Sequence, residues 1–398
     1  MTADYDVVVV GGGINGVGVA QAVAAAGHSV LLLEKTSLAA GTSSKSSKLI
    51  HGGLRYLESY EFGLVRESLL ERELLLRLAP DLVHLQSFCV PLYEVSRRDP
   101  WLLRTGLSLY YLLSGCNRDA RFSSVARAEW AQLDGLTTEG LKAVFRYTDA
   151  ATDDAALTAA VMRSAEMLGA ELQCRAEFIN GELTSDGVRV DYRLPKAECS
   201  CTAKVLINAA GPWVNKVLSR VSPQQKQISV ELVQGTHIEV PGTMGEDFYY
   251  VESPRDGRAV FVMPRNGRIM IGTTETRYRS DPDFVKPLAN EESYLLNVAG
   301  HYFPQLASLR RDDMVASWAG LRVLPGGEGH AFHRSRETIL HTDRARQPRV
   351  LSIYGGKLTS YRATAQKIAE QISGSLPQRH PVARTQELPL TPYDYDGL

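Results

Sequence analysis

The chain has 398 residues, which exceeds the usual size of a single hydrophobic core, so we expect two domains. Its hydrophobic content of 44% is ample for globular cores, and its formal net charge of −1 argues against the basic field of a nucleic-acid-binding protein. Five scattered cysteines without Cys-x-x-Cys spacing indicate reduced thiols rather than disulfides or a metal site. With no signal-peptide pattern and no run of the roughly 18 apolar residues that span a bilayer, we expect a cytoplasmic protein.

The N-terminal segment predicts a dinucleotide-binding βαβ unit. An apolar, β-branched strand over residues 5–10 leads into Gly11-Gly-Gly-Ile-Asn-Gly16, which fits the pattern G-x-G-x-x-G. A helix of small apolar residues over 17–26 and a second strand over 28–33 follow, and this strand ends at Glu34. Because strand, glycines, helix and acidic residue are all in register, we predict a nucleotide site here.

Each glycine of this motif has a physical role. Gly11 permits a tight turn, Gly13 lets the backbone approach a pyrophosphate, and Gly16 lets the helix pack closely on the strand. The helix N-terminus offers free N–H groups to phosphates, and Glu34 is placed to accept hydrogen bonds from ribose hydroxyls. The alternative is a tight turn that needs glycines for backbone reasons alone.

The middle of the chain predicts helices and then strands. An amphipathic helix over 60–78 ends before Pro80, residues 90–145 read as a helical excursion, and Asp153-Asp154 cap a helix that runs to Met167. Within the excursion, residues 101–113 are apolar and aromatic with arginines nearby. Two interpretations stay open for them: an ordinary buried helix, or a helix lying in a membrane interface.

Alternating apolar residues predict an antiparallel sheet in the second half. Strands are expected first over 171–174, 187–192 and 204–207. The antiparallel sheet, distinct from the parallel core, is expected over 229–233, 236–240, 259–263 and 268–271. A helix near 291–302, a loop at Arg322 and a strand over 350–353 follow, and this strand meets Gly355-Gly356 at the start of a final helix. The polar segment from Leu376 onward predicts no regular structure.

Strand, glycine and helix therefore recur at both ends of the chain, which predicts a discontinuous cofactor domain. We expect this domain over 1–90, 145–225 and 340–378, a substrate domain over 91–144 and 226–339, and a tail over 379–398. Gly326-Gly-Glu-Gly329 lacks a flanking strand and helix, so we expect one dinucleotide site rather than two. If that site holds FAD, electrons would come from a small substrate and leave to a quinone, oxygen or a protein carrier.

Several motifs together resemble FAD-dependent glycerol-3-phosphate dehydrogenases of the aerobic, quinone-reducing type, within the D-amino-acid-oxidase-like flavoprotein superfamily. In family order they are Gly11–Gly16, Thr42–Phe62, Asn208–Val214, Gly235–Ile238, Ile271–Thr274, Gly320–Arg322, Gly355–Thr359 and Tyr361-Arg362. The resemblance implies an α/β fold with a Rossmann-like FAD-binding domain, whose parallel sheet is of the glutathione-reductase type, and a substrate domain with a large antiparallel sheet. FAD is the implied cofactor.

The resemblance also implies the residues that contact the cofactor. Around the ADP half they are Gly11, Gly13, Ile14, Asn15, Gly16, Glu34 and Lys35. Around the flavin they are Thr42, Ser43, Ser44, Ser47, Lys48, Leu49, His51, Gly52, Ala210, Gly211, Gly355, Gly356, Lys357, Leu358 and Thr359.

Glycerol 3-phosphate, the substrate that the resemblance implies, carries two negative charges, so its pocket needs cations. The planar guanidinium of arginine can donate two parallel hydrogen bonds to a phosphate. The candidates for substrate contact are Arg55, Tyr56, His237, Thr274, Arg322, Arg336 and Lys357, and those for catalysis are His237, Arg322 and Lys357. Oxidation at C2 moves a hydride to flavin N5 and a proton to a base, for which His237 is the candidate because its unperturbed pKa lies near neutrality. The alternatives are an ordinary strand histidine and surface ion pairs of the arginines.

The sequence departs from the family pattern in two places. Gln234 precedes Gly235 where the family carries lysine, which would weaken one pocket contact. Family members also continue after Glu387-Leu-Pro-Leu390 with a helical domain of roughly a hundred residues, and we expect the flavin and substrate sites not to depend on it.

Three functions remain at this point. The first is oxidation of sn-glycerol 3-phosphate to dihydroxyacetone phosphate with electrons passed to quinone. The second is oxidation of another small substrate, such as a 2-hydroxy acid or an amino acid, and the third is a non-catalytic flavin-binding assembly protein. The expected partners are glycerol 3-phosphate, a quinone or other acceptor, the inner membrane surface through peripheral contact, and a second copy of the chain, but no nucleic acid.

Overall fold

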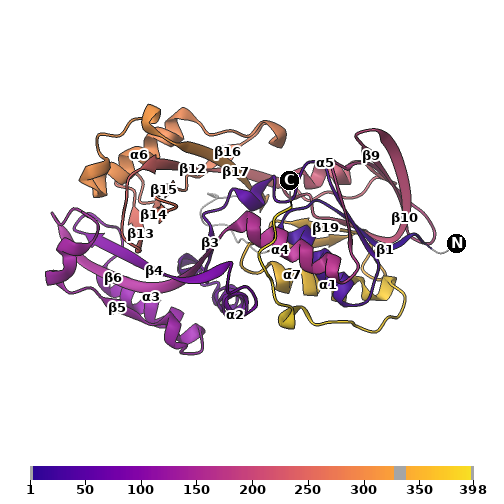
Figure 1. The fold of residues 1–398 in the computed structure, drawn as a ribbon, viewed down its shortest axis with the longest axis horizontal. Coiled ribbons are helices and arrows are strands. Elements are labelled where there is room, and N and C mark those ends of the chain that lie inside the picture. Colours follow the sequence, from indigo (N-terminus) through magenta and orange to yellow (C-terminus); the bar gives the residue numbers. More distant parts are fainter. Residues whose placement is uncertain (1–2, 327–337, 396–398) are drawn as a thin grey trace.

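The computed structural model describes residues 3–326 and 338–395, which form two sheets with helices packed against them (Figure 1). In the first sheet, five parallel strands lie in the order β7-β2-β1-β10-β19. Their bounds are Glu171–Cys174, Val30–Glu34, Tyr5–Val10, Ala197–Asn208 and Val350–Tyr354. β8 (Glu177–Leu183), β9 (Val188–Leu194), β11 (Val221–Ser222) and β18 (Ile339–Thr342) extend this sheet.

The valine run of β1 is buried on both faces, as expected for a central parallel strand. Val7 and Val9 pack in one core with helices α1 (Ile14–Ala25), α4 (Asp154–Met167) and α7 (Tyr361–Ile372). Val8 and Val10 pack in a second core with β8 and β9. Side chains that alternate along the strand thus hold a layer on each side of the sheet.

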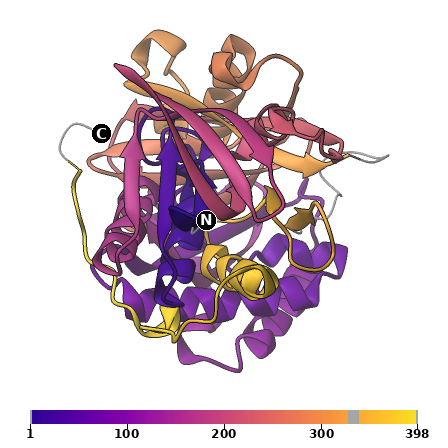
Figure 2. The same cartoon turned by 90° about the vertical axis from the view of Figure 1, so that its right-hand side faces the viewer.

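Helix α1, near the N-terminus, and helix α7, near the C-terminus, lie side by side in this region (Figure 2). The approach of α1 to α7 is so close that a Cβ on Gly18 would lie 2.7 Å from the ring of Tyr361. The side chain of Asp153 caps α4 by accepting from the N–H groups of Ala155 and Ala156, as the sequence predicted. The predicted fold class is confirmed, and the domain boundaries stay a prediction.

The second sheet follows the order β16-β12-β15-β14-β13-β4-β6-β3, with β17 beside β12 and β5 beside β6. In that order the bounds are Thr276–Tyr278, Val230–Pro241, Arg268–Gly272, Ala259–Arg265, Phe248–Glu252, Val83–Tyr93, Leu141–Thr152 and Leu49–Ile50, then Ala316–Pro325 and Phe122–Ser124. Helix α6 (Ala289–Tyr302) contributes Leu295, Val298 and Ala299 to the core against this sheet. The expected antiparallel pattern holds except that β13 pairs in parallel with β4.

Two expectations from the sequence differ from the structure, and the described part of the tail, which has no regular structure beyond the 3-10 turn Thr385–Glu387, is nevertheless packed. The segment 90–145 is not wholly helical, because it holds one α-helix, α3 (Pro100–Leu113), between strands β4, β5 and β6. Arg322 lies on strand β17 rather than in a loop. The tail is packed: Leu390 is buried, and its N–H donates to the carbonyl of Leu78 at the end of α2 (Phe62–Leu78).

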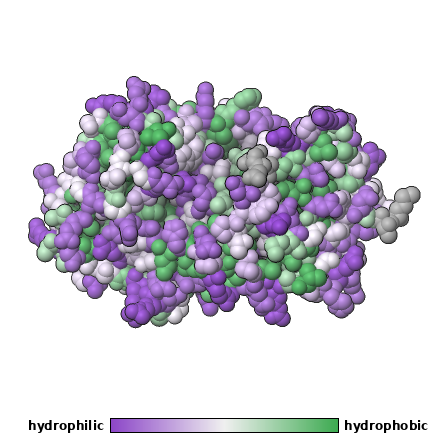
Figure 3. Space-filling view, in the orientation of Figure 1, coloured by the Kyte–Doolittle hydropathy of each residue, from purple (hydrophilic) through white to green (hydrophobic). Residues whose placement is uncertain are grey.

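Figure 3 shows a mainly polar face with hydrophobic residues scattered among charged ones. Among the described residues, no helix combines the length and the apolar character that crossing a membrane requires.

Candidate functional site

The carboxyl ends of the parallel strands open into one cavity of about 760 Å³. The segments that follow β1, β2, β10 and β19 all line it, with Gly11, Lys35, Ala209 and Gly355 among the lining residues. Ligands of parallel α/β sheets bind at this edge, because the loops and helix N-termini converge there. Parts of β12 and β17 of the second sheet line the opposite side.

The glycine turn after β1 has the shape that a pyrophosphate requires. Gly11 has a φ of +111°, and a Cβ on Gly16 would lie 1.9 Å from the carbonyl oxygen of Gly11. Helix α1 begins at Ile14 with Gly13 as N-cap, the N–H of Ile14 donates to the hydroxyl of Ser43 at 2.9 Å, and Gly13, Ile14 and Asn15 line the cavity. A larger residue would close this cradle, which supports the predicted nucleotide site.

Three hydrogen bonds fix the carboxylate of Glu34 beside the glycine turn. Its carboxylate accepts from the N–H of Gly12 at 2.7 Å and from the N–H and hydroxyl of Thr36 at 2.8 and 3.0 Å. This fixes an acidic group beside the glycine turn, where a ribose hydroxyl is expected.

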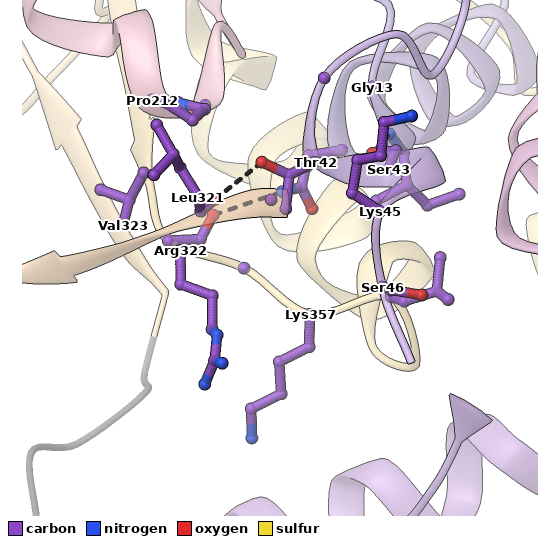
Figure 4. A pocket seen from close by; sticks show the side chains of 18 of the residues that line it. Gly13, Thr42, Ser43, Lys45, Ser46, Pro212, Leu321, Arg322, Val323 and Lys357 are labelled. Atoms are coloured by element: carbon purple, nitrogen blue, oxygen red, sulfur yellow. Dashed lines mark hydrogen bonds between the residues drawn. The ribbon is translucent and has the colours of Figure 1, made fainter. Parts of the chain in front are cut away.

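The loop at residues 42–48 joins the two sheets across the cavity. The hydroxyl of Thr42 donates to the carbonyl of Leu321 on β17 at 2.7 Å (Figure 4). β17 also passes so near that a Cβ on Gly320 would lie 2.8 Å from Cβ of Lys45. The predicted flavin loop therefore contacts the strand that carries Arg322.

Asp154, which is fully buried at the start of α4, anchors this loop from behind. Its carboxylate accepts from the N–H and hydroxyl of Ser46 at 3.0 and 2.7 Å and pairs with the ammonium of Lys48. Lys48 is itself buried, with a φ of +61°. The structure thus places Lys48 behind the cavity wall, where it orders the loop.

The segment at residues 51–53 rests on a second buried network. The N–H of Gly52 donates to the hydroxyl of Tyr110 at 2.9 Å, and that hydroxyl donates to Asp149 at 2.7 Å. Asp149 also pairs with the fully buried Arg72 at 2.9 Å. His51 lines the cavity, whereas Gly52 is packed against Tyr110 and Leu69.

The glycines after β19 close the cavity near the first helix. Gly355 and Gly356 have φ values of +82° and +115°, and a Cβ on Gly356 would lie 2.3 Å from Nδ2 of Asn15. That amide donates to the carbonyl of Gly355 at 3.4 Å. Contacts between residues near opposite ends of the sequence therefore complete the cofactor cradle.

Cationic side chains gather at the other end of the cavity. Arg322 donates through Nη2 to the carbonyl of Thr274 at 3.0 Å, and its Nη1 lies 3.6 Å from the carboxylate of Glu275. Arg55 lies 4.0 Å from the same carboxylate. The ammonium of Lys357 lies 3.9 Å from the ring centroid of Tyr56, and Figure 4 shows it beside Arg322.

His237 lies on β12 beside these cations. Its Nε2 shares a hydrogen bond of 2.9 Å with the hydroxyl of Ser47, and its ring stacks on Trp318. Burial, then the charges of Arg322 and Lys48, lower the pKa of His237 to about 3. The imidazole is therefore neutral at physiological pH, which differs from the near-neutral pKa expected from the sequence.

Most of the predicted site residues lie along this one cavity. The lining includes Gly11, Gly13, Ile14, Asn15, Glu34, Lys35, Thr42, Ser43, Ser47, Leu49, His51, Arg55, Tyr56, Ala210, Gly211, His237, Arg322, Gly355, Gly356, Lys357, Leu358 and Thr359. Gly16, Ser44, Lys48, Gly52 and Thr274 do not line it, and Arg336 falls outside the described residues.

Two side chains expected at the pocket face Glu291 instead. The hydroxyl of Thr274 donates to Glu291 at 2.8 Å, and the amide of Gln234 donates to the same carboxylate at 2.6 Å. Gln234 is buried and does not line the cavity, so its side chain contacts Glu291 rather than a ligand in the cavity.

Sequence reasoning missed Glu275 and Trp318. Glu275 directly follows the motif Ile271-Gly-Thr-Thr274, and a carboxylate next to a predicted anion site was a usable signal. Trp318 lies opposite His237 in the register of β12 and β17, so only knowledge of the pairing could have revealed it.

Comparison with known proteins identifies this architecture. The family model described as FAD-dependent oxidoreductase matches residues 6–371. The chain is 38% identical over 386 residues to glycerol-3-phosphate dehydrogenase of Pseudomonas tolaasii, which covers 95% of this chain and 73% of that protein. It is 36% identical over 380 residues to D-erythritol 1-phosphate dehydrogenase of Brucella abortus, which covers 94% and 74%.

A solved structure is similar over nearly the whole chain. The glycerol-3-phosphate dehydrogenase from Bacillus halodurans, complexed with FAD, superposes with a TM-score of 0.73 at 26% identity, covering 97% of this chain and 67% of that one.

Proposed function

Because the chain belongs to the FAD-dependent oxidoreductase family, we propose that it oxidises sn-glycerol 3-phosphate to dihydroxyacetone phosphate with FAD as cofactor. The observation that carries this proposal is the meeting of Arg55, Arg322 and Lys357 beside His237 at one end of the cavity. Bound FAD would supply the two-electron acceptor for the hydride that leaves C2 of the substrate.

The cations suit a dianionic phosphate. Arg55, Arg322 and Lys357 bring three basic side chains to this end of the cavity, and Glu275 lies within 4.0 Å of both guanidinium groups. Two guanidinium forks can bind phosphate oxygens in pairs, and an ammonium on the face of Tyr56 adds a third charge. A substrate without a phosphate would lack the negative charge that these contacts use.

His237 is the proposed acceptor of the proton from the C2 hydroxyl. Its neutral imidazole has a lone pair available, and the stacked Trp318 and the hydroxyl of Ser47 fix the ring orientation. The charge of Arg322 is one cause of its low pKa. A phosphate dianion bound beside Arg322 would offset that charge and raise the pKa of His237 as the substrate enters.

A substrate panel tests the proposal and one alternative. Turnover should require phosphate: sn-glycerol 3-phosphate should be oxidised, whereas glycerol, 2-hydroxy acids and amino acids should not. Since one similar protein is an erythritol-phosphate dehydrogenase, D-erythritol phosphates belong in the panel as the second candidate substrate. Equal turnover of glycerol and its phosphate would contradict the proposed role of the cations.

The basic residues give a sharper form of the same test. Arg322→Ala should raise KM for the phosphorylated substrate by about 10²-fold or more, because it removes a charged hydrogen-bonding group. Arg189→Ala is a matched control, since Arg189 is exposed on β9 and pairs with Asp191 of the same strand. An unchanged KM in Arg322→Ala would count against the proposal.

We further propose that electrons pass to quinone and that α3 contacts the inner membrane surface. One face of α3 is buried through Leu103, Leu107 and Tyr110, whereas Trp101, Leu102 and Leu112 are exposed. Exposed apolar side chains near arginines suit an interfacial helix. Binding to anionic vesicles should weaken with salt and with Trp101→Ser, and absence of binding at low salt would contradict the membrane contact.

A second copy of the chain as partner stays a prediction.

A further inference from the structure

A short connecting segment of the second sheet extends to the end of the cavity at which the nucleotide is expected to bind. It is the 3-10 turn Pro282–Phe284, which follows β16 and is capped by the side chain of Asp281. Asp281 accepts from the N–H of Asp283 at 3.0 Å, and Tyr278 donates to the carbonyl of Asp281 at 2.9 Å. These bonds present the carboxylate of Asp283 in a defined position.

That carboxylate meets three donors from the loops and helix after the parallel strands. Oδ1 of Asp283 pairs with Nζ of Lys35 and accepts from Nε1 of Trp213 at 2.9 Å, and Oδ2 lies 3.0 Å from Nζ of Lys216. Asp281 adds a second contact to Lys216 at 3.2 Å. Lys35 also lies 4.2 Å from the ring centroid of Trp213. The cluster is therefore a connected network rather than an isolated surface pair.

Both sides of this network line the cavity. Lys35, Trp213 and Lys216 line it from the first sheet, and Pro282, Asp283 and Val285 line it from the second. Lys35 directly follows Glu34, and the ring of Trp213 would contact a Cβ placed on Gly41, next to the loop at residues 42–48. The contact thus joins the segment after β16 to helix α5 (Val214–Leu218), two elements that are labelled in Figure 1.

We propose that Asp283 is a latch that holds residues 282–285 across the ADP end of the FAD site and slows release of the cofactor. A dinucleotide lying between these walls would be released more easily once the walls part, and this requires Asp283 to separate from Lys35, Trp213 and Lys216. Asp283 stays ionised at neutral pH: burial raises its pKa, but the ion pairs with Lys35 and Lys216 outweigh burial and lower the pKa to about 2.

The contacts of Asp283 differ in charge from the hydrogen bond between Thr42 and Leu321, which also crosses the cavity. The side chains of Lys35, Asp283 and Lys216 are 36 to 46% exposed, so added salt should screen their attraction. The bond between Thr42 and Leu321 joins a hydroxyl to a carbonyl and carries no net charge. Salt should therefore speed FAD release mainly through Asp283.

The test measures FAD release from the holoenzyme, by the rise in flavin fluorescence after dilution. It compares about 0.01 M with about 1 M NaCl, between which the Debye length falls from about 30 to about 3 Å. We expect Asp283→Ala to release FAD about three- to tenfold faster at low salt and to lose most of the salt effect. Glu67→Ala is the matched control, because Glu67 pairs with Lys367 at 2.6 Å on α2 and α7, away from the cavity lining.

Wild-type release rates and salt dependence in Asp283→Ala would overturn the proposal. If that variant purifies without FAD, its Kd for added FAD should be weaker by a similar factor, and an unchanged Kd would overturn the proposal. Lys216→Ala, which leaves the contacts of Asp283 with Lys35 and Trp213, should show an intermediate release rate. No substrate is needed, so the outcome is independent of which alcohol the protein oxidises.

Discussion

The indole of Trp318 stacks on the imidazole of His237, with ring centroids 5.6 Å apart and planes inclined by 11°. The two residues face each other across the register of β12 and β17. On β15, which pairs with β12 on its other side, a Cβ on Gly272 would lie 2.0 Å from the His237 ring. The ring therefore has little freedom to turn. Among the described residues, its Nδ1 is buried without a hydrogen-bond partner. The geometry holds a neutral histidine in one orientation at the cavity wall.

If His237 accepts the substrate proton, its replacement should lower kcat strongly. We expect His237→Gln to reduce kcat by about 10²- to 10⁴-fold, the usual contribution of a general base. Flavin content and absorbance spectrum should stay unchanged. His84→Gln, at an exposed position of β4, is the control. A kcat within a factor of about three of wild type would remove His237 from this role.

The low pKa of His237 also predicts a pH dependence of stability. Between pH 6.5 and about 3, the unfolded chain binds a proton on this imidazole that the folded chain does not. The free energy of unfolding should therefore fall on acidification, by at most about 1.4 kcal/mol per pH unit from this group. Urea unfolding of wild type and His237→Gln at about pH 7 and about pH 5 measures it. The variant should lose less stability than wild type, and equal losses would contradict the low pKa.

Two glycines allow a matched test of the phosphate turn. Gly16→Ala places a methyl group 1.9 Å from the carbonyl oxygen of Gly11, so the turn must shift and FAD should be lost. Gly63→Ala meets nothing within 4 Å in helix α2 and should stabilise the fold by about 0.5–1 kcal/mol. Flavin content per chain and thermal unfolding measure both. Full FAD occupancy in Gly16→Ala would show that the turn tolerates displacement.

The buried pair of Arg72 and Asp149 supports the wall behind His51. Both side chains are almost completely buried, and Asp149 also accepts from Tyr110. Arg72→Met should lower the free energy of unfolding by about 3–5 kcal/mol, because it leaves a buried carboxylate without its cation. Arg189→Met, which breaks an exposed pair, should cost about 0–1 kcal/mol. Similar losses in the two variants would show that Asp149 finds another partner.

The parts of the site that were predictable from the sequence are local ones. The glycine turn and Glu34 belong to one short βαβ unit, whose periodicity and punctuation are readable without knowledge of distant contacts. Gly355 and Gly356 were recognisable for the same reason, because a buried strand runs directly into them.

The parts that were missed depend on pairing between distant segments. Arg322 lies on a strand because β17 pairs with β12, and its own sequence, Gly320-Leu-Arg, reads as a loop. Glu275 matters only because folding brings Arg55 and Arg322 to it. The tail, polar by composition, packs because Leu390 finds a buried position beside Leu78.

An anaerobic titration of the FAD-loaded protein with sn-glycerol 3-phosphate tests the central claim most directly. The substrate should bleach the flavin absorbance band in proportion to the amount added, and Arg322→Ala should need far more substrate for the same bleaching. A flavin band that dithionite bleaches but sn-glycerol 3-phosphate leaves unchanged would contradict the proposed function.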